Sequence, residues 1–79
     1  MSNDFYNVKL TDKDVYRMLY LNKVEGKLPY QLEEQFPVSR TTIKNIVNGK
    51  SRKDCYHAFM TLKTRQPNKL KEVFKELSA

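Results

Sequence analysis

Apolar residues in this chain recur three or four positions apart, in runs that glycine and proline separate. The separating residues are Gly26, Pro29, Pro37, Gly49 and Pro67. A spacing of three or four gathers apolar side chains on one face of a helix, whereas a strand would alternate them every second residue. We therefore predict an all-α fold. Because 79 residues can bury one hydrophobic core at most, we expect a single domain over residues 1–79.

The first helix is predicted over residues 12–24. Thr11 can cap its free N–H groups while Asp14 reaches back to the Thr11 backbone, and Gly26 lies where a left-handed residue would end the helix. Tyr16 and Tyr20 are expected at the rim of the core. An inward stripe running to about Val24 is formed by Val15, Met18, Leu19 and, on its flank, Leu21.

Two short helices with a turn between them are predicted next, over residues 29–36 and 40–48. Pro29 suits a first helical position, where its missing N–H would be unpaired anyway, and Pro37 ends that helix. Ser39 can cap the following helix and Gly49 can close it. Its buried face would be Ile43, Ile46 and Val47. Two short helices joined in this way form the helix-turn-helix arrangement.

Two more helices are predicted over residues 52–63 and 68–77, with Ser51 and Asn68 as their caps. The last helix belongs to a C-terminal extension, residues 64–79, and residues 1–9 form an N-terminal arm. One face of the last helix is apolar, so it either packs back on the domain or pairs with a second copy in a homodimer. This face consists of Leu70, Val73, Phe74 and Leu77.

Positive charge is concentrated in the middle of the chain. Residues 38–65 carry seven Lys or Arg against Asp54 alone, whereas residues 1–37 carry five basic and six acidic residues. The whole excess behind the net charge of +6 therefore lies in this segment. Such concentration is typical of a surface that binds phosphates, although a basic face that is merely solvated is the alternative.

A family resemblance is carried by the residues around the second turn. The pattern comprises Phe36, Val38, Ser39, Arg40, Thr42 and Ile43. With the rest of residues 10–54 it resembles the homeodomain-like helix-turn-helix of resolvase/invertase-type recombinases and of small phage DNA-binding proteins. The run VSRTTIKNIVNGK is also similar to lambda-repressor-like regulators.

These families bind DNA through the helix that corresponds to the one predicted here over residues 40–48. The resemblance implies that base edges meet Arg40, Thr41, Lys44 and Asn45. Ser39 and Thr42 would lie nearer the phosphates. Further candidates for phosphate contact, from the same outer face and the basic segment, are Asn48, Lys50, Arg52 and Lys53.

Two positions depart from the pattern of those families. Pro37 stands where glycine is usual, and because the proline ring holds φ near about −65°, the turn must be shaped differently. Glu33 stands where a small residue is usual. Either the two helices pack further apart, or Glu33 turns outward.

Catalysis has little support in this sequence. Cys55 is the one cysteine and His57 the one histidine, and residues two apart point to different sides of a helix. Neither a Cys–His dyad nor a metal pair is therefore favoured, and two glycines cannot build a phosphate-binding loop. We expect a protein that is not an enzyme and has no metal, no cofactor and no small-molecule substrate. Cys55 would be a core residue and His57 a surface residue.

The predicted function is sequence-selective binding of double-stranded DNA, as a transcriptional regulator that represses by occupying an operator. A DNA-binding accessory factor for site-specific recombination is the first alternative. The second is a protein-interaction adaptor or antirepressor that uses the C-terminal helix. The lone cysteine and the lack of a long apolar stretch or leader favour a cytoplasmic, nucleoid-associated protein without a membrane role.

Overall fold

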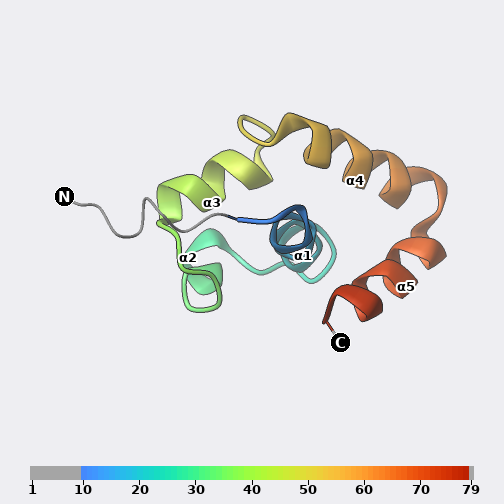
Figure 1. Ribbon diagram of the computed structural model, residues 1–79, viewed down its shortest axis with the longest axis horizontal. Helices are drawn as coiled ribbons and strands as arrows, with labels where there is room; N and C mark the ends of the chain where they lie inside the picture. Colours follow the sequence, from blue (N-terminus) through green and yellow to red (C-terminus); the bar gives the residue numbers. More distant parts are fainter. Residues whose placement is uncertain (1–9, 79) are drawn as a thin grey trace.

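The computed structural model describes the backbone of residues 10–78 and the side chains of residues 10–76, and this part of the chain is all-helical (Figure 1). The predicted fold class is confirmed. The N-terminal arm expected at residues 1–9 lies outside the described residues. In chain order the helices are α1 (Asp12–Lys23), α2 (Pro29–Leu32), α3 (Arg40–Val47), α4 (Lys53–Arg65) and α5 (Pro67–Ser78).

The central helix of the fold is α1, which contacts each of the other four. In Figure 1 it is seen nearly end-on, with α3 and α4 arching over it and α2 and α5 on either side. The burial of apolar side chains against α1 therefore holds the five helices together. The fully buried side chains are Val15, Met18, Leu19, Leu32, Ile43, Ile46 and Phe59.

The predicted N-terminal cap of α1 is confirmed, whereas its C-terminal cap is Val24 and not Gly26. The backbone N–H of Asp14 donates to Thr11 Oγ1 at 3.1 Å, and the Thr11 N–H donates to the Asp14 carboxylate at 3.4 Å. Gly26 has the expected left-handed φ of 77°. The prediction that the buried face of this helix extends to Val24 was wrong, because Val24 follows the last helical residue and is 41% exposed.

The predicted length of α2 was also wrong, since the helix ends at Leu32 and not at residue 36. The N–H groups of Glu34 and Gln35 donate to carbonyls three residues back, which tightens the chain into turns. These turns carry Phe36 into the core, where it is 4% exposed. Pro37 keeps the helix from including Phe36, because its ring disfavours helical backbone at the residue before it.

The later helices begin at different residues from those predicted. Ser51 does not cap α4; that position belongs to Arg52, with a left-handed φ of 51°. The last helix begins at Pro67 and not after Asn68, because proline needs no partner for a first-turn N–H. By contrast, Ser39 caps α3 as expected and accepts from the Thr42 N–H at 3.3 Å.

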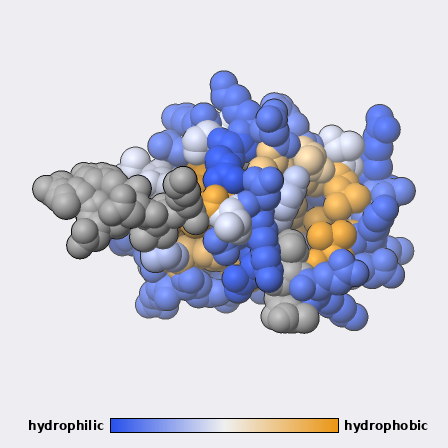
Figure 2. Space-filling model, viewed as in Figure 1, coloured by the Kyte–Doolittle hydropathy of each residue, from blue (hydrophilic) through white to orange (hydrophobic). Residues whose placement is uncertain are grey.

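The apolar face of α5 packs back on α1 and α4. Leu70 is buried, and the Phe74 ring stacks on Tyr20 with 3.9 Å between ring centroids. Tyr20 therefore belongs to the core and not to its rim. A hollow of about 190 Å³ remains between these helices, and Figure 2 shows hydrophobic side chains gathered between α4 and α5. The side chain of Leu77 lies outside the described residues, and the homodimer stays a prediction.

No helix between residues 10 and 78 is a candidate for crossing a membrane. None of the helices there combines the length and the hydrophobicity that a bilayer span requires.

Candidate nucleic-acid interface

The helix α3 has two faces of opposite character. Ile43, Ile46 and Val47 are buried, as predicted, where α3 contacts α1 and α2. The other face is polar, and α3 with its C-cap contains no acidic residue. Four of its candidate DNA-binding residues are exposed and Asn45 is half-buried. The exposed four are Arg40, Thr41, Lys44 and Asn48.

The two hydroxyl groups expected near phosphates lie together at the start of α3. Ser39 Oγ and Thr42 Oγ1 are 3.1 Å apart, and Ser39 is exposed while Thr42 is half-buried. Each hydroxyl can donate one hydrogen bond and accept others. When Thr42 is the donor of this pair, the exposed Ser39 hydroxyl keeps its own proton for a contact with an anion.

The turn before α3 is built without a left-handed residue. Among residues 10–78, positive φ values occur at Gly26, Gly49 and Arg52, none of which lies in this turn. Instead, the Val38 N–H donates to the Phe36 carbonyl at 2.8 Å, which closes a three-residue turn centred on Pro37. The expectation that Pro37 gives the turn a different shape is confirmed.

Glu33 turns outward and contacts the first residue of α3. It is the C-terminal cap of α2, and its Oε1 accepts a hydrogen bond from Arg40 Nε at 2.8 Å. Because α2 and α3 are in contact, the side chain has not forced the two helices apart. The structure thus selects the outward alternative for Glu33.

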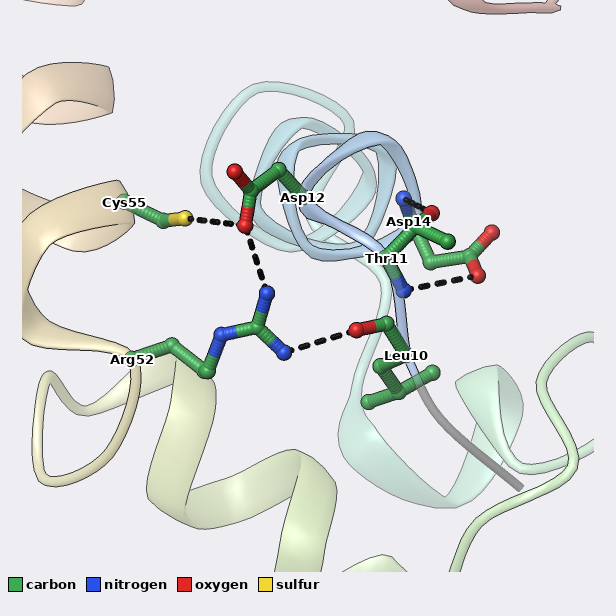
Figure 3. Close-up of polar contacts among 6 residues, drawn as sticks. All are labelled: Leu10, Thr11, Asp12, Asp14, Arg52 and Cys55. Carbon is green, nitrogen blue, oxygen red and sulfur yellow. Dashed lines mark hydrogen bonds and ion pairs between the residues drawn. The ribbon is translucent and has the colours of Figure 1, made fainter. Parts of the chain in front are cut away.

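Arg52, predicted as a phosphate contact, has its guanidinium against the residues at the start of α1 (Figure 3). Its guanidinium donates to the Leu10 carbonyl at 2.8 Å and to Asp12 Oδ1 at 2.6 Å. Asp12 also accepts from the Cys55 thiol at 3.4 Å. These contacts join the start of α1 to the start of α4. Sequence reasoning missed them, because no local pattern pairs residues forty positions apart.

This cluster shifts the pKa values of two of its members. The hydrogen bond from Arg52, followed by that from Cys55, lowers the pKa of Asp12 below its usual range. Burial, followed by the hydrogen bond to Asp12, raises the pKa of Cys55, so that the thiol keeps its proton at neutral pH. The stability from Asp12 is therefore present above the ordinary aspartate pKa and is lost as the pH falls through the lowered value.

Cys55 and His57 lie apart, as their spacing predicts. Cys55 is buried in the core, whereas His57 is exposed and packs edge-on against the Tyr56 ring. Within the described residues, no group of three or more His, Cys, Asp or Glu side chains could hold a metal ion. Nothing in this arrangement makes the pair a reactive centre.

The remaining cations divide into two groups. Lys50 and Lys53 are exposed beside the start of α4, close in sequence to the end of α3. Lys63 and Arg65 lie at the other end of α4, about 15 Å or more along the helix at roughly 1.5 Å per residue. The basic segment is therefore not one continuous patch. Arg40 and Lys44 are exposed on α3 itself. Together with Lys50 and Lys53 they form what we call the α3 basic group.

No protein-family model matches this chain, and no match is found among curated proteins or solved structures. The helix-turn-helix interpretation therefore depends on the residues between 29 and 48 and on their observed geometry. That geometry comprises two short helices in contact, a tight turn centred on Pro37, and a second helix with one buried and one polar face.

Proposed function

We propose that this protein binds double-stranded DNA sequence-selectively, with α3 as the helix that enters the major groove. One observation carries the proposal. The helix buries an apolar face in the core and leaves an acid-free polar face outside, with Arg40, Thr41 and Lys44 exposed on it. A groove about 12 Å wide admits one α-helix, and a polar helix face lined with donors is what reads base edges there.

The outer side chains of α3 match the chemistry of base edges. Arg40 and Lys44 are long donors that suit the O6 and N7 acceptors of guanine. The Asn45 amide can both donate and accept, which suits adenine, and the Thr41 methyl group can contact that of thymine. These residues are the proposed base-reading set.

Phosphate contacts would come from the residues around this set. Ser39 and Asn48 lie at the two ends of α3, and Lys50 and Lys53 follow in the loop and at the start of α4. Such contacts fix the register and orientation of a protein on the duplex, while base contacts carry the sequence information. A protein that occupies an operator in this way represses transcription without any chemical step.

Affinity for duplex DNA should fall steeply with salt. If the two charged phosphate anchors, Lys50 and Lys53, each neutralise one phosphate, log K should change with log salt concentration by about −1.8, at about −0.9 per contact. Fluorescence anisotropy of a labelled random duplex, titrated at several salt concentrations, measures this slope. A slope near zero would contradict DNA binding through this surface.

Base readers and phosphate anchors should respond differently to truncation. Asn45→Ala should cost roughly 1–3 kcal/mol on the preferred sequence and less on random duplex, which narrows the ratio of the two affinities. Lys53→Ala should weaken both bindings alike and reduce the salt slope by about one. The preferred sequence is obtained by selecting bound duplexes from a random pool, and all affinities are compared at one salt concentration.

The reverse pattern would exclude α3 as the reading helix. That pattern is an unchanged affinity ratio in Asn45→Ala together with a collapsed ratio in Lys53→Ala. The selected sequences carry a second result. Two inverted half-sites about one helical turn, or roughly 34 Å, apart would indicate that two copies bind together, whereas a single unpaired motif would indicate one.

A further inference from the structure

The ion pair between Glu33 and Arg40 joins the end of α2 to the first residue of α3. Its contact distance is 2.8 Å, and both side chains remain accessible, Arg40 at 59% and Glu33 at 33%. Seven residues separate them in the sequence, so the pair spans the turn of the helix-turn-helix. A carboxylate thus lies beside the cation that would meet the DNA first.

Stability gives little reason for this pair. Exposed ion pairs contribute little to folding, because water screens the charges and two long side chains must be ordered. For a surface that binds phosphates, moreover, Glu33 adds a negative charge where a neutral residue would bind more tightly. The contact is therefore expected to lower the affinity for DNA in general while adding little to the stability of the fold.

The atoms that form the contact suggest its role. An arginine carries five N–H donors, one on Nε and four on the two terminal nitrogens. Glu33 accepts from Nε, so Nη1 and Nη2 keep their donors for another partner. The edge formed by these two nitrogens can donate two parallel hydrogen bonds, which is the geometry that guanine O6 and N7 require.

We propose that Glu33 is a positioning residue, which holds the Arg40 guanidinium by Nε so that its Nη1 and Nη2 edge reads guanine. The inference rests on the proposed function. A guanidinium that is held in place loses less conformational freedom when it binds its base.

The test compares the affinity for the selected duplex with that for random duplex at one salt concentration. Glu33→Ala should narrow this ratio roughly three- to tenfold, which is part of the discrimination that a bidentate arginine provides. Glu34→Ala is the matched control, because it removes the same charge from an exposed neighbour. Glu33→Gln keeps an oxygen acceptor for Nε and should retain most of the ratio.

A double-mutant cycle shows whether Glu33 acts through Arg40. In an Arg40→Ala background, Glu33→Ala should leave the ratio unchanged. If Glu33→Ala leaves the ratio of the natural protein unchanged, or if Glu33→Gln narrows it as much as Glu33→Ala does, Glu33 does not position Arg40. If the unaltered protein binds no duplex even at low salt, the proposed function fails and this inference fails with it.

Discussion

Phe59→Ala is expected to leave most of the protein unfolded at 25 °C. Phe59 is 1% exposed and is among the largest fully buried side chains of the core. Truncating a buried phenylalanine costs roughly 3–5 kcal/mol through lost burial and the cavity that remains. A domain of this size, without a disulfide, rarely exceeds about 3–5 kcal/mol of stability in total. The expected loss therefore equals most of the available free energy of unfolding.

Far-UV circular dichroism during urea denaturation checks this expectation. Tyr30→Ala is the matched control, because it removes an aromatic ring that is 53% exposed. Surface substitutions of this kind usually change stability by about 0.5 kcal/mol or less. A Phe59→Ala protein with the urea midpoint of the control would show that the core does not centre on this residue.

Gly49→Ala is expected to destabilise the protein more than Gly26→Ala, although both glycines have a φ of 77°. A methyl group at Gly49 would lie 3.0 Å from two carbons of the Tyr56 ring, whereas one at Gly26 would meet nothing within 4 Å. Gly26→Ala thus carries only the cost of left-handed backbone, roughly 1–2 kcal/mol. Gly49→Ala adds the strain of overpacking and should reach roughly 2–4 kcal/mol.

Urea denaturation of the two variants gives the comparison directly. Because the backbone term is common to both, the difference between their free energies of unfolding isolates the contact with Tyr56. Equal losses in the two variants would mean that the Tyr56 ring moves aside at no cost. Gly49 would then matter only for ending α3.

Features set by neighbouring residues could be predicted from the sequence. The capping box of Thr11 and Asp14 and the Ser39 cap depend on residues at most three apart. The same holds for the polar and buried faces of α3, because helical spacing alone assigns Ile43 to the core and Lys44 to the surface. The candidate reading face therefore follows from this local spacing alone.

Features set by distant residues could not be predicted. The basic neighbours of Arg52 suggested a phosphate contact, which stays a prediction, but they gave no sign that its guanidinium donates to Leu10 and Asp12, forty or more positions away. Tyr20 seemed a rim residue because its partner Phe74 belongs to α5. For Glu33 the sequence left two orientations open, and the choice depended on how the chain turns at Pro37.

The last helix, α5, lies away from α3, the helix proposed to read DNA. Within the part of the chain that the structure describes, α5 contacts α1 and α4 but neither α2 nor α3. Both helices pack on α1 and α4, but the outer face of α3 is exposed, so substitutions there and in α5 should have free-energy effects that add. Substitutions on the exposed side of α5 should therefore leave the proposed specificity of α3 unchanged.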